Sequence, residues 1–375
     1  MLNYELKNRP DIYFGQGKLN ELSTIISTYN NILLVYGKSS IKKNGLYDKV
    51  ISLLKDKNIV EFGGIKPNPP NSQLNEAVSI CKEKNIDLIL AVGGGSVIDG
   101  AKAISIASKS NNSCWDIFIN KEDIKEKTDL VTIITNVATG SETNDISVIL
   151  NDDIDLKRSY KHHSMYPKAA ILDPEVTMSV NKYYTTYGLI DTFSHLLEQL
   201  INDKNEVVVN NLIISLLKDL MVISPQLLAD LENVELRENH MFISMYGYNG
   251  EFRAYLTGDW ACHGLDYGIA SLWDNTHGAG LSVVTPNYIE YLENNEIINN
   301  VGKQLFNTST NKEFALALRE YFNSLGAVAT FKDMDINPSD DQLKEMASKA
   351  MFLSPLGGVG KLNEEDVYNI YKKCL

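Results

Sequence analysis

The first half of the chain alternates short β-rich runs with apolar residues at helical spacing, and this alternation constrains the fold more than any other feature. The β-rich runs span residues 31–36, 59–62, 87–92, 130–134 and 169–172. Two helical stripes separate the first three runs, one on Leu46, Val50, Leu53 and Leu54 and the other on Leu74, Ala77, Val78 and Cys81. Strands that alternate with helices predict a parallel sheet covered by helices on both faces.

The pattern changes after Asp173-Pro174. From about Tyr183 onward the apolar spacing is helical, as in a stripe from Leu212 to Leu220 that we expect to stop at Pro225. A chain of 375 residues is longer than one compact core usually holds. We therefore expect an α/β domain over residues 1–181 and an all-helical domain over residues 182–375.

Composition excludes several classes of partner. The formal net charge of −13 argues against nucleic acid, which needs a clustered basic face. No apolar run approaches the roughly 18–20 residues that cross a membrane, and the first ten residues do not resemble a signal peptide. The four cysteines form no CxxC pair, so we expect buried or surface thiols in a reducing cytoplasm.

A glycine-rich segment, Ala91-Val-Gly-Gly-Gly-Ser-Val-Ile-Asp99, lies where a predicted strand gives way to a helix. Glycine lets the backbone approach a phosphate closely, and a helix N-terminus offers free N–H groups. The segment departs from GxGxxG because Ile98 stands at the third position. We interpret it as a diphosphate cradle, with a simple strand-to-helix turn as the alternative. A second, weaker candidate is Asn136–Thr143, whose small hydroxyl residues also suit helix caps.

Asp191 and His195 stand four residues apart in an apolar helical stretch, so both side chains lie on one helix face and can reach one cation. On this spacing alone, a buried hydrogen-bonded pair explains them equally well. His263 and His277 are 14 apart, about 21 Å on one unbroken helix, but residues 273–276 predict a turn that can bring them together. One carboxylate and three imidazoles suit zinc or divalent iron. His240 lies on a polar stretch and is expected at the surface.

These pieces together resemble the iron-containing alcohol dehydrogenase family, and most closely its branch of NADPH-dependent butanol dehydrogenases and aldehyde reductases. The resemblance runs nearly the whole chain. It covers Glu61–Pro69, Ala91–Gly100, Ala138–Glu142, Leu172–Pro174, Asp191–His195 and Asp259–His263. It implies a Rossmann-like domain followed by a helical domain (the dehydroquinate synthase-like fold), with the active site in the cleft between them.

The resemblance also implies site residues. The family's single divalent metal is held by an Asp and three His, which match Asp191, His195, His263 and His277. The diphosphate and ribose loop matches Gly94, Gly95, Ser96 and Asp99. Further cofactor contacts match Asn68, Thr135, Thr139 and Lys157.

Cofactor preference is predicted from the end of the first β-rich run. Family members that prefer NAD carry an acid there, which would repel a 2′-phosphate. This chain has Gly37, Lys38, Ser39 and Ser40, whose hydroxyl and ammonium groups favour an extra phosphate. We therefore expect NADP over NAD, with a solvated lysine turn as the alternative.

One position departs from the family. A histidine assigned to proton relay usually stands four residues beyond the third metal ligand, and this chain has Tyr267 there. A phenol with a pKa of about 10 relays protons less well at neutral pH, so the departure affects the rate, the substrate range and the proton pathway but not metal binding.

The function expected from the sequence is hydride transfer between NADP(H) and a small alcohol or aldehyde, in a cytoplasmic protein that forms a homodimer. Two alternatives remain: another enzyme of the superfamily, such as a glycerol dehydrogenase or a dehydroquinate synthase, and a catalytically weakened nucleotide-binding or sensing protein. A dehydroquinate synthase needs basic residues that are missing around Asp191. Further candidates for the substrate pocket, each with a packing role as the alternative, are Lys161, His162, His163, Phe252 and Trp260.

Overall fold

The computed structural model describes residues 9–120, 123–204, 206–252, 256–351 and 354–375. These residues form two compact units. The first contains the described residues up to Asn181 together with Leu231–Met245, and the second contains Lys182–Asp230 and Tyr246–Leu375.

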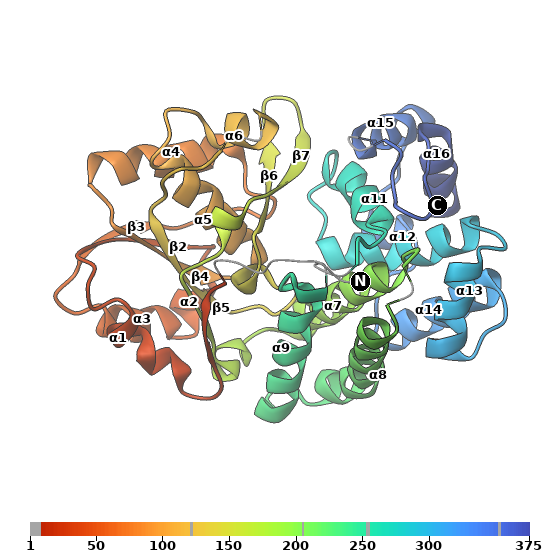
Figure 1. Ribbon diagram of the computed structural model, residues 1–375, viewed down its shortest axis with the longest axis horizontal. Helices are drawn as coiled ribbons and strands as arrows, with labels where there is room; N and C mark the ends of the chain where they lie inside the picture. Colours follow the sequence, from red (N-terminus) through yellow and green to blue (C-terminus); the bar gives the residue numbers. More distant parts are fainter. Residues whose placement is uncertain (1–8, 121–122, 205, 253–255, 352–353) are drawn as a thin grey trace. The chain divides into compact units, whose positions relative to one another are not determined.

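The first unit is built on a six-stranded sheet with the order β1-β8-β5-β4-β2-β3, in which all neighbouring strands are parallel (Figure 1). The strands are β1 (Asp11–Phe14), β2 (Asn31–Tyr36), β3 (Asn58–Phe62), β4 (Leu88–Gly93), β5 (Asp129–Ile134) and β8 (Ala169–Leu172). Every residue of β4 is buried, because helices cover both faces of a parallel sheet. The predicted parallel sheet is therefore confirmed, and the five predicted runs coincide with β2, β3, β4, β5 and β8.

Helices connect these strands. The longer ones are α3 (Leu46–Leu53), α4 (Asn71–Glu83), α5 (Gly95–Ala107) and α6 (Cys114–Asn120), and two single-turn helices are α1 (Leu22–Ile25) and α2 (Ser40–Lys43). The two predicted apolar stripes form the buried sides of α3 and α4. α5 begins directly after β4 and is buried along most of its length.

The strand order creates a switch point between β2 and β4. From β2 the chain proceeds to β3 on one side, and from β4 it proceeds to β5 on the other. In open α/β sheets, ligands bind where the order reverses, at the carboxyl ends of the strands. The loops after β2 and β4 meet at this edge, since a Cβ on Gly37 would lie 3.6 Å from Val97 in the first turn of α5.

Two features of this unit were not predicted. β1 is a short edge strand with exposed or half-buried residues, so it lacks the apolar run that identified the other strands. A separate antiparallel hairpin joins β6 (Ile146–Asn151) to β7 (Leu156–Lys161) and packs beside α5. The sequence of β7, LKRSYK, is too rich in charge to predict a strand.

The second unit is helical, as predicted. Its helices are α7 (Lys182–Leu200), α8 (Val207–Ala229), α11 (Ala261–Ala270), α12 (His277–Tyr291), α13 (Glu296–Phe306), α14 (Asn311–Ser324), α15 (Asp340–Ala350) and α16 (Glu364–Lys373). α9 (Val234–Tyr248) begins in the segment grouped with the first unit and ends in the second. Within the second unit, α12 packs against α7, α11 and α14.

Two expectations for helices were wrong. α8 continues through Pro225 to Ala229. Proline removes a single helical hydrogen bond, and the buried side chains of Leu227 and Leu228 favour one further turn. His240 is only 2% exposed, because it lies on an inward side of α9 rather than on a solvated surface.

Among the described residues, α8 is the one helix that is long and apolar enough to cross a membrane, judged by length and composition alone. Lys218 and Asp219 interrupt the apolar run of this helix. In its most apolar window, with a mean hydropathy of 1.7, 33% is buried, and α8 packs against α7. A single helix of this kind is weak evidence for a membrane protein.

Candidate functional site

α7 carries the first two predicted metal ligands. Asp191 and His195 are 2% and 4% exposed, and Asp191 Oδ1 lies 3.2 Å from His195 Nδ1. Every residue of α7 from Thr185 to Leu200 is buried, so this helix is covered on all sides. The polar pair is therefore held on a rigid helix in an apolar setting, which demands a partner for the charged carboxyl group.

The other two histidines come from α11 and α12. His263 lies in the first turn of α11, and His277 is the first residue of α12. The predicted turn between them is present at residues 271–276. It brings His263 Nε2 to 3.8 Å and His277 Nε2 to 3.6 Å from Asp191 Oδ1. All four predicted ligand side chains are thus gathered around one carboxylate oxygen.

The donor atoms of this cluster suit a cation. Asp191, His195 and His263 each offer one ligand atom, and these three atoms lie within 4.8 Å of one another. Among the described residues, Asp191 Oδ1, His195 Nδ1 and His263 Nε2 are fully buried and have no hydrogen-bond partner. Buried polar atoms normally have partners, and a divalent cation would satisfy all three at once.

Two buried carboxylates contact the Nδ1 atoms of His263 and His277 and orient these two rings. Glu198 accepts a hydrogen bond from Cys262 N (2.6 Å) and also contacts His263 Nδ1. Asp266 Oδ2 lies 2.5 Å from His277 Nδ1. A carboxylate on one ring nitrogen fixes the ring and leaves the other nitrogen, Nε2, to face a metal.

The pKa values of the clustered side chains favour the binding of a cation. Burial alone would raise the pKa of Asp191, but the surrounding histidines hold it well below its usual range. Burial lowers the pKa of His195 to about 3, so this ring is neutral at physiological pH. Burial also acts to lower the pKa of His263, yet the Glu198 and Asp191 carboxylates raise it to about 9. A bound cation would take the place of the proton on His263.

Glu198 and Asp266 were not predicted as site residues. Each stands three residues after a predicted ligand, Glu198 after His195 and Asp266 after His263. Both are 0% exposed. An acidic residue within an apolar helical stretch was the available signal, but its histidine partner lies on another segment and cannot be read from spacing.

The glycine segment forms a tight turn in the first unit. A Cβ on Gly95 would lie 2.5 Å from the Thr139 side chain, and a Cβ on Gly94 would lie 3.3 Å from Asn136. Thr135 N donates to Gly93 O at 3.0 Å, which ties the loop after β5 to the loop after β4. A side chain at Gly95 would clash with Thr139, and the first N–H groups of α5 have no partners within the helix. The geometry suits a diphosphate.

The remaining predicted cofactor residues lie around this cradle. Asp99 Oδ1 accepts from Ser141 Oγ (2.5 Å) and Asp99 Oδ2 from Val148 N (3.1 Å). Burial raises the pKa of Asp99, and the positive charges of Lys102 and Lys157 act against that shift. Lys157 is therefore close to Asp99, buried on β7. Asn68 is half-buried, with a left-handed backbone (φ 46°) that asparagine tolerates.

The loop after β2 is exposed at Lys38, Ser39 and Ser40. Lys42, one turn further on, is paired with Glu61 (3.3 Å), and Glu61 also accepts a hydrogen bond from Tyr36 Oη (2.7 Å). The ammonium group of Lys42 is thus already paired with a carboxylate of the protein.

Other candidates lie elsewhere. Phe252 is buried in the second unit, whereas Lys161, His162 and His163 belong to the first unit and not to the one that holds the histidine cluster. Tyr267 is partly exposed on α11, one turn beyond His263. Trp260 stands directly before α11, with its ring centroid 5.5 Å from that of His263.

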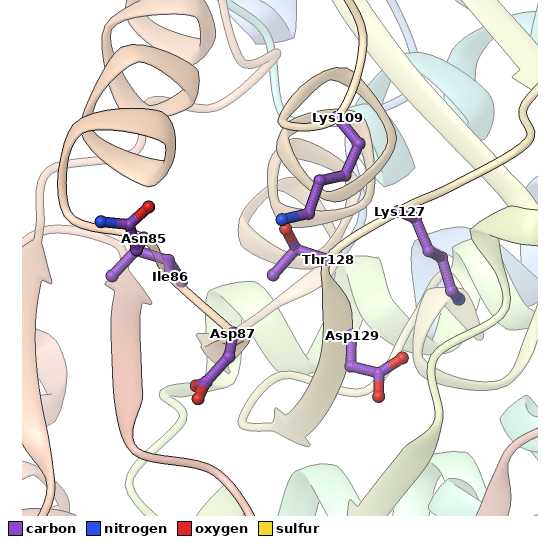
Figure 2. Close-up of a pocket in the computed structure, with 7 residues that line it drawn as sticks. All are labelled: Asn85, Ile86, Asp87, Lys109, Lys127, Thr128 and Asp129. Atoms are coloured by element: carbon purple, nitrogen blue, oxygen red, sulfur yellow. The ribbon is translucent and has the colours of Figure 1, made fainter.

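A hollow at the opposite edge of the sheet does not resemble an active site. Figure 2 shows its lining at the amino ends of β4 and β5, with Asp87, Asp129 and Lys127 among the labelled side chains. Asp87 accepts hydrogen bonds from the Asn30 and Asn31 backbone, and Lys127 donates to Tyr166 O (2.7 Å). These charged groups fix the ends of strands, so the hollow is a structural feature.

Comparison with known proteins identifies the family. Residues 10–174 match the model for iron-containing alcohol dehydrogenase, and residues 185–375 match the C-terminal model of the Fe-containing alcohol dehydrogenase family. The chain belongs to the iron-containing alcohol dehydrogenase family. Probable NADH-dependent butanol dehydrogenase 1 of Bacillus subtilis (strain 168) is 38% identical over 100% of both chains. NADPH-dependent aldehyde reductase YqhD of Escherichia coli (strain K12) is 32% identical over 76% of this chain and 75% of its own.

Solved structures agree with this assignment. The crystal structure of NADH-dependent butanol dehydrogenase A from Thermotoga maritima superimposes with a TM-score of 0.94 at 30% identity, covering 100% of this chain and 99% of that one. The family resemblance, the fold and the expectation of a metal- and nicotinamide-dependent alcohol dehydrogenase are therefore confirmed.

Proposed function

We propose that this alcohol dehydrogenase reduces small aldehydes with NADPH, and oxidises the corresponding alcohols, using a divalent cation held by Asp191, His195, His263 and His277. The observation that carries the proposal is the convergence of one buried carboxylate and three imidazoles. Among the described residues, the donor atoms of Asp191, His195 and His263 have no hydrogen-bond partner. The relatives named as butanol dehydrogenases and as an aldehyde reductase support the substrate class.

The residues present would divide the work as follows. When bound, the cation supplies a Lewis acid for the substrate oxygen, and the nicotinamide supplies or accepts the hydride. Glu198 and Asp266 hold the rings of His263 and His277, so little reorganisation is needed during the reaction. Tyr267 shares a helix face with His263, and we include it as the proton-relay residue of this proposal.

We propose that Gly94, Gly95 and Ser96 bind the diphosphate of the nucleotide, with Asp99, Asn68, Thr135, Thr139 and Lys157 around it. The preference for NADP rests on the loop Gly37–Ser40. Its exposed Lys38 ammonium and the hydroxyls of Ser39 and Ser40 would receive a 2′-phosphate, since Lys42 is already paired with Glu61. Relatives of both preferences are known by name, so this finer point depends on the chain's own loop.

The decisive experiment measures NADPH oxidation with butanal in protein loaded with Fe²⁺, in the same protein after chelation, and in His263→Ala. We expect chelation and the substitution each to abolish turnover. Full turnover in His263→Ala would refute the site. Tight NADPH binding without turnover in the loaded wild type would instead support a nucleotide sensor.

We also propose that the enzyme is a cytosolic homodimer. All four cysteines are free and buried, which suits a reducing compartment. Light scattering on the purified protein should give twice the mass of one 41.9 kDa chain. A monomeric mass at micromolar concentration would refute the dimer.

A further inference from the structure

Trp260 has an unusual backbone for a large residue. It is the N-cap of α11, three residues before His263, and its φ of 62° and ψ of 17° lie in the left-handed region. Bulky side chains rarely adopt this conformation, and such strain persists only where the surroundings enforce it. The conformation therefore needs a structural cause and invites a functional explanation.

The residues on either side enforce this backbone. Asp259 N donates to Glu198 O (2.8 Å), which ties the preceding residue to α7. The Asp259 carboxylate accepts hydrogen bonds from Val359 N (2.7 Å) and Tyr288 Oη (2.5 Å). The residue before Trp260 is thus held in place by hydrogen bonds, and the residues after Trp260 form α11.

The indole itself is locked in place. Trp260 Nε1 donates to Thr257 O at 2.7 Å. The ring lies so close to Gly258 that a Cβ there would stand 2.6 Å from Nε1. On another side it packs against Tyr248, with ring centroids 5.0 Å apart. An aromatic ring held by a hydrogen bond and two contacts has little freedom to move aside.

This fixed ring borders the histidine cluster. Its centroid lies 5.5 Å from that of His263, in an edge-on arrangement, and 6.3 Å from that of His195. Tyr248 stacks on His195 at 4.4 Å and completes the same aromatic wall. Asp191 and His195 are almost fully buried, whereas Trp260 keeps part of its surface exposed. Trp260 is therefore a partly exposed aromatic residue in contact with the buried ligand cluster.

From these contacts we infer that Trp260 is a specificity-determining residue, whose fixed indole limits the width of the space beside the histidine cluster and excludes aldehydes branched at the carbon next to the carbonyl. The inference rests on the proposed aldehyde reduction and adds a substrate class to it, namely unbranched aliphatic aldehydes. A rigid aromatic ring cannot move to make room for a branched carbon, whereas an unbranched chain can lie along the face of the ring.

The test compares kcat/KM for butanal and 2-ethylbutanal in the Fe²⁺-loaded wild type, Trp260→Gly and Trp260→Phe. Glycine adopts the left-handed backbone without strain and removes the indole ring. Phenylalanine keeps a smaller ring but loses the hydrogen bond to Thr257 O. We expect Trp260→Gly to raise the 2-ethylbutanal to butanal ratio by at least about tenfold, and Trp260→Phe to raise it less. Trp115→Phe, in α6 of the other unit, is the matched control and should leave the ratio unchanged.

Iron content and circular dichroism are measured on every variant, so that a change in substrate selectivity is distinguished from loss of metal or of folded structure. If Trp260→Gly fails to fold, Trp260→Phe alone decides. A ratio equal to that of the wild type in the folded, iron-loaded Trp260 variants would overturn the inference while leaving aldehyde reduction intact. A loaded wild type that reduces neither aldehyde would instead refute the proposed function.

Discussion

Glu142→Gln should stabilise the first unit at alkaline pH but not at acidic pH. Glu142 is 3% exposed in the loop after β5, and its Oε2 has no hydrogen-bond partner among the described residues. Burial raises its pKa from the ordinary 4.5 to about 7, although the buried ammonium group of Lys102 acts in the opposite direction. Between these two pH values the folded protein holds a proton that the unfolded chain has released, so stability falls as the pH rises.

The magnitude follows from the shift. A pKa raised from 4.5 to about 7, at about 1.36 kcal/mol for each tenfold change in proton affinity, corresponds to a loss of about 3 kcal/mol once the pH exceeds 7. Glutamine has nearly the same shape and does not ionise, so it avoids this loss. For a unit of this size the difference corresponds to about 6–12 °C in Tm.

The assay is thermal unfolding of nucleotide-free protein, followed by circular dichroism at pH 5 and pH 8.5. Glu142→Gln and the wild type should differ little in Tm at pH 5, where only a small part of the loss is present, and the variant should melt clearly higher at pH 8.5. Glu76→Gln, an exposed site on α4 of the same unit, is the control and should follow the wild type at both values. An equal Tm for Glu142→Gln and the wild type at pH 8.5 would show that the buried carboxyl group does not carry this cost.

Three further predictions concern the proposed metal site and the proposed nucleotide site. Glu198→Gln should weaken Fe²⁺ binding about 10–100-fold, because His263 loses its carboxylate partner. Competition with a chelator measures the Fe²⁺ affinity, and Glu296→Gln, at an exposed position, is the control. Gly95→Ala should place a methyl group against Thr139 and weaken NADPH binding by about tenfold or more, as measured by calorimetry, and undiminished affinity would argue against the cradle. Lys38→Ala should lower the preference for NADPH over NADH by about tenfold in kcat/KM, and an unchanged preference would remove the lysine from phosphate recognition.

The sequence predicted those parts of the fold that have a local signature. Buried parallel strands such as β4 are continuous apolar runs, and they were found. The edge strand β1 and the charged strand β7 were missed, because pairing with a neighbour rather than an apolar run defines them. Pro225 was expected to end a helix, and burial of the following turn overrode that local preference.

For the site, local spacing was informative only within one helix. Asp191 and His195 lie four apart, so their proximity could be inferred directly. Bringing His263 and His277 to them required either the tertiary structure or the family resemblance. The Glu198 and Trp260 contacts with His263 were beyond reach, because they depend on how separate helices pack.

The charge balance of the histidine cluster links metal binding to the packing of the three helices that carry it. Asp191, Glu198 and Asp266 bury three carboxyl groups in one small volume, and unpaired buried carboxylates are costly. A divalent cation offsets two of the three charges and satisfies the partnerless donor atoms. It would therefore stabilise the packing of α7, α11 and α12 as well as serve the reaction.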